Sequence, residues 1–111
     1  MKNIKIKKDH FRQSRGGGSK LLKVVCVQCS DFVLVYQKDG KGNLFRLYLD
    51  RIHHPDSLVK IVSSWNMISQ MDNLHCNNCK SLLAVPMVYE PEKRLALRII
   101  QGTIHLSKYK E

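Results

Sequence analysis

The chain has 111 residues, 43% of them hydrophobic, and its 19 lysines and arginines against 9 acidic residues give a formal net charge of +10. This length fits one domain with a modest core, which a metal cross-link would help to stabilise. No apolar run approaches the roughly 20 residues that span a bilayer, and no continuous apolar stretch follows the lysine-rich start, so we expect neither membrane insertion nor secretion.

The N-terminal part carries most of the charge. Residues 1–23 hold eight basic residues against Asp9 alone, a net charge of +7. Three consecutive glycines stand between Gln13 and Ser19, and ordering glycine is entropically costly. We therefore predict a flexible basic arm over 1–20 and a single β domain over 21–111. Such an arm is either a solubilising terminus or a phosphate-contacting segment, whose candidate residues are Lys5, Lys7, Lys8, Arg12 and Arg15.

The first half of the domain is predicted to form β structure. A β-branched run over 21–25 leads into Cys26-Val27-Gln28-Cys29. Alternation predicts a strand over 31–37 and a returning strand over 44–52, joined by a glycine-containing hairpin turn over 38–43. The first cysteine pair would then lie at one end of a long antiparallel hairpin. The segment 38–43 lacks the length and the following helix of a P-loop, which favours a turn over a phosphate cradle.

The middle of the chain is less regular. His53 and His54 precede Pro55, which biases its neighbour away from helical backbone. Periodicity does not decide between a short helix ending at Ser63 and a strand over 58–62. We interpret the histidines as a surface pair, because the spacing places no carboxylate to orient them for metal binding or acid-base work.

The second half is predicted to return to β structure. Cys76-Asn77-Asn78-Cys79 forms a second tight turn, in which an asparagine suits left-handed backbone. Strands are predicted over 81–89, 94–101 and 103–109, and Pro86 indicates that the first of them is an edge or bulged strand.

The two cysteine pairs carry the strongest functional signal. They supply four soft ligands for a closed tetrahedral zinc site, and no cysteine is left over. Disulfides are the alternative, but in the reducing cytoplasm or nucleus that we expect for this chain, metal ligands are favoured. His75 is a substitute ligand that four cysteines make unnecessary, and iron is the alternative metal. We therefore expect one structural Zn²⁺ per chain, bound by Cys26, Cys29, Cys76 and Cys79.

The layout resembles the β-tent superfamily, in which two sheets meet at a zinc bound by two C-x-x-C pairs about this far apart. The resemblance covers residues 21–110 and is clearest at HCNNCKSLLAVP and at the strand pair RLALRIIQGTIHL. Members include Yippee proteins, the ligand-binding domain of cereblon, methionine-R-sulfoxide reductases, exchange-factor-like chaperones of Rab GTPases, and RNA-binding regulatory domains of innate-immune helicases. A zinc ribbon with a long insertion is the alternative fold.

The resemblance implies different functions for different relatives. The reductases need a further cysteine as nucleophile, which this chain lacks. The Yippee and cereblon pattern has Gly-Trp soon after the second turn, where this chain has Ala84-Val85-Pro86, so an aromatic cage is not expected. The helicase-type domains bind RNA through a basic face, for which this chain offers Lys38, Lys41, Arg46, Arg51, Arg94 and Arg98.

A module that binds RNA or DNA through the arm and a basic sheet face is the first functional hypothesis. Tyr36, Phe45 and Tyr48 would provide stacking surfaces if they are exposed. A protein-interaction or adaptor module is the second hypothesis. An enzyme is not expected, because four thiolates leave no open position on the zinc. A thiol redox protein is the remaining alternative, although the chain lacks the βαβ context of a thioredoxin.

Overall fold

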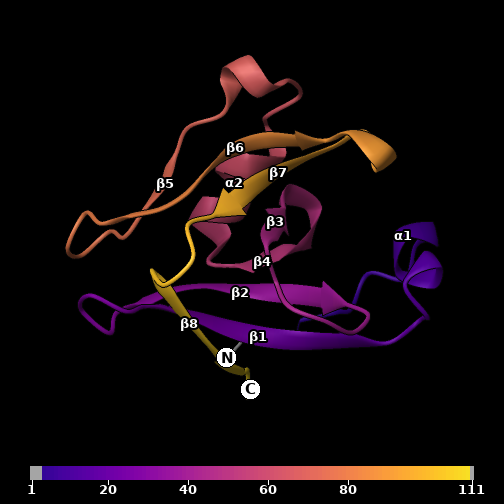
Figure 1. Cartoon of the computed structure of the whole chain (residues 1–111), viewed down its shortest axis with the longest axis horizontal. Helices are drawn as coiled ribbons and strands as arrows, with labels where there is room; N and C mark the ends of the chain where they lie inside the picture. The colour runs from indigo at the N-terminus through magenta and orange to yellow at the C-terminus, as the bar shows by residue number, and fades with distance from the viewer. Residues whose placement is uncertain (1–3, 111) are drawn as a thin grey trace.

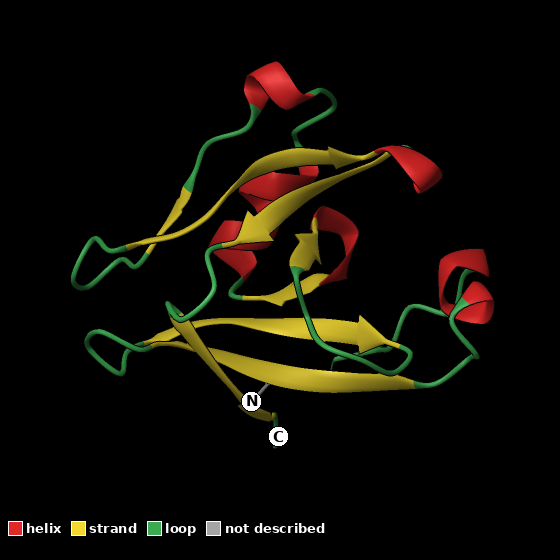
Figure 2. Ribbon diagram, in the orientation of Figure 1, coloured by secondary structure: helices red, strands yellow, loops and turns green. Residues whose placement is uncertain are grey.

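The computed structural model describes residues 4–110, which form two four-stranded antiparallel sheets (Figures 1 and 2). The strand order is β4-β2-β1-β8 in the first sheet and β3-β7-β6-β5 in the second. The predicted mainly β fold with two antiparallel sheets is therefore confirmed. In the described residues no helix is both long and apolar enough to cross a membrane.

The first sheet is built on one long hairpin. β1 (Ser19–Cys26) pairs with β2 (Phe32–Asp39), and the first cysteine turn joins them. β8 (Ile104–Lys108) pairs with β1, and β4 (Ile52–His54) pairs with β2. Strand β1 therefore begins two residues earlier than the predicted domain boundary.

The second sheet contains β3 (Arg46–Tyr48), β7 (Arg94–Ile99), β6 (Leu82–Tyr89) and β5 (Leu74–His75). The prediction that Pro86 marks an edge or bulge is correct only locally. Pro86 faces Leu97 in a regular β6–β7 register, and β5 pairs with β6 only at Leu82 and Ala84. At Pro86, strand β6 therefore pairs with β7 on one side and with no strand on the other. The missing N–H of the proline costs no backbone hydrogen bond on that open side.

The predicted hairpin between 31–37 and 44–52 is wrong. After β2 the chain crosses to the second sheet, where β3 pairs with β7 at Leu47↔Leu97. The predicted returning strand is then broken by the short helix η1 (Leu49–Arg51) before β4 returns to the first sheet. The break has a physical reason, since η1 places the Arg51 side chain in the interior beside carboxylates, as described below.

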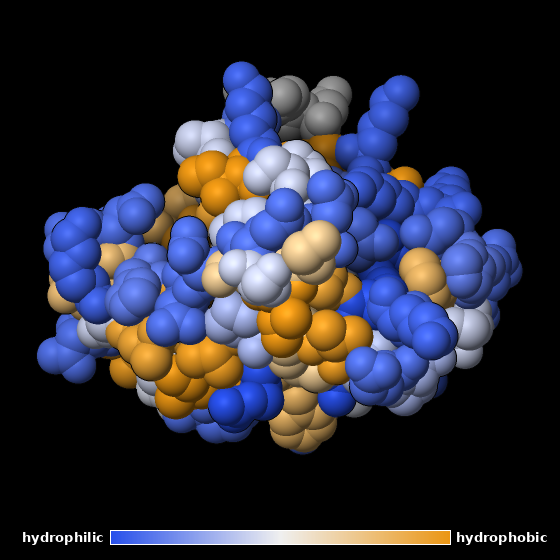
Figure 3. Space-filling model, turned by 90° about the horizontal axis from the view of Figure 1, so that it is seen from above, coloured by the Kyte–Doolittle hydropathy of each residue, from blue (hydrophilic) through white to orange (hydrophobic). Residues whose placement is uncertain are grey.

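Short helices make up the connections. α2 (Asp56–Ser63) resolves the ambiguity at 58–62 in favour of a helix, and it buries Val62. η2 (Ile68–Gln70) and η3 (Glu90–Glu92) lie in the connections before β5 and β7. Seen from above, the molecule is mostly hydrophilic, with separate hydrophobic patches divided by polar residues (Figure 3).

The core lies where the two sheets face each other. Its fully buried residues come from both sheets, with Val24, Leu34 and Tyr36 from the first sheet, and Leu47, Leu83 and Leu97 from the second. Trp65 packs against this cluster from the segment after α2. The alternation of apolar residues predicted for these strands therefore points into one shared interior.

The N-terminal segment, predicted to be a flexible arm, contacts the domain in the structure. It contains α1 (His10–Ser14), which is capped by the Asp9 side chain and lies beyond the ends of β1 and β2 (Figure 1). The Lys7 backbone exchanges two hydrogen bonds of 2.8 and 2.9 Å with the Gln37 side chain. Asp9 forms an ion pair with Arg51, whose hydrogen bonds lower the pKa of Asp9 to about 2. These contacts attach the N-terminal segment to residues of the domain, which the amino-acid composition alone does not reveal.

A glycine allows this segment to approach closely. Gly40 has a φ of +76°, and a Cβ at this position would lie 2.8 Å from the backbone oxygen of Arg15. The Gly40 amide also donates to the Gly18 carbonyl at 2.9 Å. A side chain at residue 40 would therefore both strain the backbone and push the N-terminal segment away.

A buried phenol links the two sheets, which leads to a stability prediction. The Tyr48 amide of β3 donates to the hydroxyl of Tyr36 on β2 at 2.9 Å, and both groups are buried. Tyr36→Phe leaves that amide without an acceptor, so we expect a loss of about 1–3 kcal/mol in the free energy of unfolding. Denaturant unfolding monitored by circular dichroism measures it. Tyr89→Phe is the matched control, and equal losses in the two variants would contradict the prediction.

Candidate metal centre

The four cysteines meet at one point between the two sheets. Their Sγ atoms all lie within 4.8 Å of one another, and the distances are 3.6 Å for Cys26–Cys79 and 3.5 Å for Cys29–Cys76. Both of these short contacts join one cysteine turn to the other. The structure thus brings together residues that lie 47 and 53 positions apart in the chain.

The two turns have the same backbone geometry. In the first, the Cys26 amide donates to the Asp31 carbonyl and the Ser30 amide donates to the Cys26 carbonyl. Cys76, Lys80 and Ser81 repeat this pattern in the second turn. The left-handed residue is the one that follows the second cysteine, Ser30 with φ +64° and Lys80 with φ +67°.

The expectation that an asparagine supplies the left-handed geometry of the second turn is therefore wrong. Lys80 takes this role although it is neither glycine nor asparagine. Its ammonium donates to the Asn77 carbonyl at 2.7 Å, a hydrogen bond within the same turn. A local hydrogen bond thus offsets part of the cost of left-handed backbone.

Each sheet contributes one turn. Cys26 ends β1 in the first sheet, and the second turn joins β5 to β6 in the second, so the two loops lie one above the other at the same end of the molecule (Figure 1). Cys26 and Cys76 are fully buried, while Cys29 and Cys79 are half-buried. Thr103 adds a further connection, because its carbonyl accepts from the Val27 amide at 3.0 Å and its hydroxyl lies 2.7 Å from the Ile100 carbonyl and 3.3 Å from the Leu83 carbonyl.

The donor set fits a tetrathiolate metal site. In a zinc tetrahedron with Zn–S bonds of about 2.3 Å, the sulfur atoms lie about 3.8 Å apart. The observed 3.5 and 3.6 Å contacts are close to this edge length and far longer than an S–S bond of about 2.05 Å. All four cysteines are free. The four thiols could therefore hold a metal ion, and the spacing of their sulfur atoms is not that of two disulfides.

The thiols have different proton affinities in the metal-free chain. Burial raises the pKa of Cys26 to about 11. The Ser81 hydroxyl lies 3.1 Å from the Cys79 sulfur, and this hydrogen bond together with the Ser81 amide lowers the pKa of Cys79 to about 6. Sequence reasoning missed Ser81. Its signal is positional, because Ser81 and Asp31 occupy the same place after the two cysteine turns.

Metal affinity should fall as the pH is lowered. The Cys26 thiol is protonated between pH 6.5 and 8 when no metal is bound and must lose that proton on binding, so we expect at least about a tenfold loss of metal affinity per pH unit. Competition with a chromophoric chelator of known proton affinity measures it. Ser81→Ala should steepen the dependence by raising the pKa of Cys79, and an affinity independent of pH would contradict the prediction.

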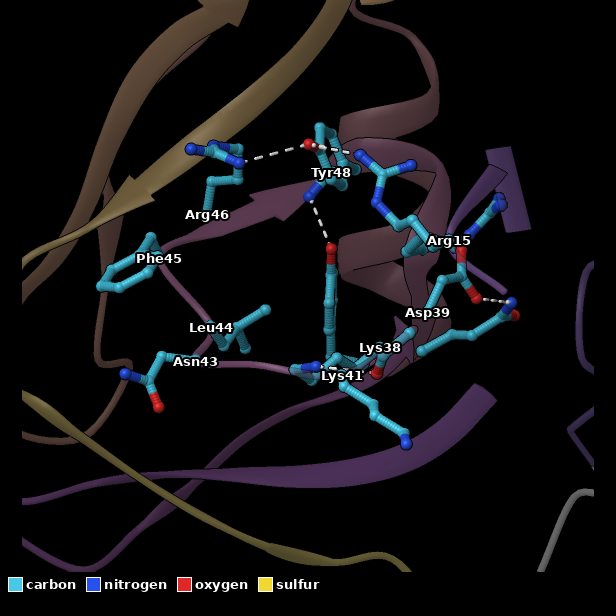
Figure 4. Close-up of a pocket in the computed structure, with 13 residues that line it drawn as sticks. Arg15, Lys38, Asp39, Lys41, Asn43, Leu44, Phe45, Arg46 and Tyr48 are labelled. Atoms are coloured by element: carbon cyan, nitrogen blue, oxygen red, sulfur yellow. Dashed lines mark hydrogen bonds and ion pairs between the residues drawn. The ribbon is translucent and has the colours of Figure 1, made fainter. Parts of the chain in front are cut away.

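The predicted nucleic-acid residues divide into two groups. The first group belongs to the N-terminal segment and consists of Lys5, Lys7, Lys8 and Arg12. The Arg12 guanidinium donates a hydrogen bond to the Ser19 hydroxyl at 2.8 Å. The other four come together from three parts of the chain and line one cavity of about 290 Å³ (Figure 4); they are Arg15, Lys38, Lys41 and Arg46. Lys38, Lys41 and Arg46 were predicted to share a basic face, but the position of Arg15 beside them was not predicted.

The wider basic face expected from the sequence is only partly present. Arg51 and Arg94 are buried, 1% and 7% exposed, because carboxylates of Asp9, Asp39, Asp50 and Glu92 surround them. Arg94 is further enclosed by the rings of Phe11 and Tyr48, at 3.9 and 3.8 Å from their centroids. These two arginines are interior groups of an ion-pair network and not part of an exposed face.

The aromatic and histidine predictions also need correction. Tyr36 and Tyr48 are buried, so their rings cannot stack on a base, whereas Phe45 is 52% exposed. The histidines do not form a simple surface pair. His53 is half-buried and its Nε2 lies 2.9 Å from the Gln37 side-chain oxygen, and burial lowers its pKa.

Comparison of the chain with protein-family models, curated proteins and solved structures found no match.

Proposed function

We propose that the four cysteines bind one Zn²⁺ that holds the two sheets together. The observation that carries this proposal is the convergence of four free Sγ atoms, two from each sheet, within 4.8 Å. Zinc is the usual occupant of a tetrahedral tetrathiolate site. The meeting of two sheets at two like cysteine turns also supports a β-tent type of fold over a zinc ribbon.

The role of this metal is structural. Four thiolates complete a tetrahedral shell, so no position is left for water or substrate. When bound, the metal supplies a cross-link between β1 and the β5–β6 turn, which the chain otherwise joins only through long connections. The half-buried Cys29 and Cys79 lie on the solvent side, and Ser81 holds one of these sulfur atoms by a hydrogen bond.

Metal analysis tests this proposal directly. Protein purified without added metal should contain one zinc per chain by mass spectrometry under native conditions and by elemental analysis. Iron at the same stoichiometry would replace zinc in the proposal but keep the site. A metal-free protein with the same fold would overturn it, and reversible oxidation of Cys26 and Cys29 would then favour a thiol redox role.

We further propose that this zinc-held scaffold binds single-stranded RNA or DNA. The supporting observation is that Arg15, Lys38, Lys41 and Arg46 border one cavity beside the exposed Phe45. Basic groups track a nucleic-acid backbone, and an exposed ring stacks on bases without reading their sequence. The alternative is an adaptor that binds a protein.

Salt dependence distinguishes these two functions. Fluorescence anisotropy with labelled oligouridine should show binding that weakens steeply as salt rises, because bound counterions are released. A slope near zero, or no binding at low salt, would remove nucleic acid as the partner. Capture of a protein partner that resists high salt would then favour the adaptor role.

A further inference from the structure

The cavity shown in Figure 4 contains more hydrogen-bond donors than acceptors. It lies between the end of β2, the 40–45 loop, β3 and the residue that follows α1. Lys38, Lys41 and Arg46 line it and form no ion pair with any carboxylate in residues 4–110. Three cations without an ion pair therefore border one small space, and the ammonium of one of them, Lys38, donates to the Gly40 carbonyl at 2.9 Å.

The carboxylate in the cavity lining does not neutralise these cations. Asp39 is held on the other side, where it accepts hydrogen bonds from Ser19 at 2.7 Å, Gln37 at 2.8 Å and Arg51 at 2.7 Å. Burial raises its pKa, but these three bonds outweigh burial and lower it overall. Only 4% of its side chain is exposed. Asp39 therefore accepts hydrogen bonds from internal donors and forms no ion pair with the three lining cations in residues 4–110, although its charge acts on the neighbouring Lys38.

Two arginines converge on one hydroxyl at the side of the cavity. The Tyr48 oxygen accepts from Arg15 at 3.0 Å and from Arg46 at 3.5 Å, and Figure 4 shows the two guanidinium groups on either side of it. Arg15 also forms an ion pair with Glu92, whereas Arg46 lies over the Tyr89 ring, 4.3 Å from its centroid, and has no carboxylate partner in residues 4–110. The charge of Arg15 is therefore offset by Glu92, whereas the charge of Arg46 remains available to an anion.

The phenols add neutral donors. Tyr48 and Tyr36 both line the cavity, and each accepts hydrogen bonds, Tyr36 from the Tyr48 amide. No described residue accepts the proton of either hydroxyl. Burial raises the pKa of Tyr36, which keeps this proton in place. The cavity thus offers O–H donors as well as cations, and a phosphate group supplies the acceptors that both kinds of donor need.

We propose that this cavity binds the phosphate group of a nucleotide, with Arg46, Lys41 and Lys38 on the phosphate and Phe45 under the base. Phe45 precedes Arg46 in the chain and is exposed at the side of the cavity, so a base can stack on its ring while the phosphate occupies the interior. The volume of about 290 Å³ lies at the lower end of the range of small-ligand pockets and suits one nucleotide.

The inference deepens the proposed nucleic-acid function by naming its site, and a free nucleotide and a strand share its chemistry. Calorimetric titration of the zinc-loaded protein with adenosine 5′-monophosphate and with inorganic phosphate tests it. The double variant Lys41→Gln/Arg46→Gln should lose about tenfold or more in affinity for both ligands. Phe45→Ala should lose about tenfold for the nucleotide and nothing for phosphate.

Lys60→Gln is the matched control, because it removes one exposed cation on α2, outside the cavity. Unchanged nucleotide affinity in the double variant, or an equal loss in Lys60→Gln, would overturn the site. Absence of nucleotide and phosphate binding by the unmodified protein would do the same. Amide NMR titration of the unmodified protein with phosphate gives an independent reading, in which Gly40, Asn43 and Tyr48 should shift and both cysteine turns should not.

Competition with oligouridine that lacks terminal phosphates separates the two sources. If it displaces the nucleotide, the cavity holds a phosphodiester of a strand. If the nucleotide binds and the oligomer does not compete, the cavity is a free-nucleotide site. Oligomer binding that the double variant leaves unchanged would keep the nucleic-acid function and overturn this site.

Discussion

Cys76→Ser is expected to prevent stable folding of the domain at 25 °C. A structural zinc site contributes about 10–16 kcal/mol in small metal-dependent domains, which equals or exceeds the roughly 5–15 kcal/mol of net stability of a typical domain. Cys76 is fully buried and provides one of the two short Sγ contacts between the turns. Circular dichroism and metal analysis of the purified variant should show lost β structure together with lost zinc.

The control lies one residue away. His75 is exposed on β5 and outside the cysteine cluster, so His75→Ala should keep both the metal and the fold. Prolonged chelation of the unmodified protein should reproduce the effect of Cys76→Ser. A chelated protein that keeps its circular dichroism spectrum and thermal midpoint would show that the core between the sheets is sufficient and that the metal is not structural.

Arg51→Met should cost about 3–5 kcal/mol in the free energy of unfolding. Arg51 is 1% exposed and donates to three carboxylates, with Nε on Asp39 at 2.7 Å and the two Nη atoms on Asp9 and Asp50. Methionine preserves most of the volume but leaves the buried Asp39 carboxylate without its cation, and an uncompensated buried charge carries a penalty of this size. Denaturant unfolding of the zinc-loaded protein measures the change.

The same variant should also release the N-terminal segment. Asp9 joins that segment to the domain through Arg51, so Arg51→Met should make the bonds after Lys8, Arg12 and Arg15 more susceptible to trypsin. Arg98→Met is the control, because Arg98 is exposed and belongs to no ion pair in the described residues, and it should change stability by less than about 0.5 kcal/mol. Equal cleavage of the two variants would mean that the ion pair does not hold the segment.

This network corrects the view of the charge obtained from composition. The sequence places most of the net charge at the N-terminus and suggests a freely moving arm. In the structure, Asp9 pairs with Arg51 and Arg15 pairs with Glu92. The most basic segment is therefore attached by two ion pairs, to which it contributes the carboxylate in one and the guanidinium in the other. A charge count cannot show this, because it records the number of charges and not their partners.

What the sequence by itself determined is local. The alternation of apolar and polar residues predicted most of the strands, and the spacing within each C-x-x-C pair predicted two tight turns whose four sulfur atoms meet. Strand alternation and tight turns are both determined by residues that are neighbours in the sequence. Strand pairing was decided only by tertiary structure. The segment 38–43 looks like a hairpin turn, yet β3 pairs with β7, about 50 residues later, and Leu47 is buried in the core between the two sheets.

The tertiary structure alone also decided which cations are available. Arg46, Arg51 and Arg94 are equivalent in a list of basic residues, but two of them lie in the interior, and Arg46 faces a cavity with Lys38 and Lys41. The physical reason is that a buried guanidinium needs carboxylates on several sides, and Asp9, Asp39, Asp50 and Glu92 come together only when both sheets and the N-terminal segment are in place. Such long-range complementarity leaves no periodic or spacing signal in the chain.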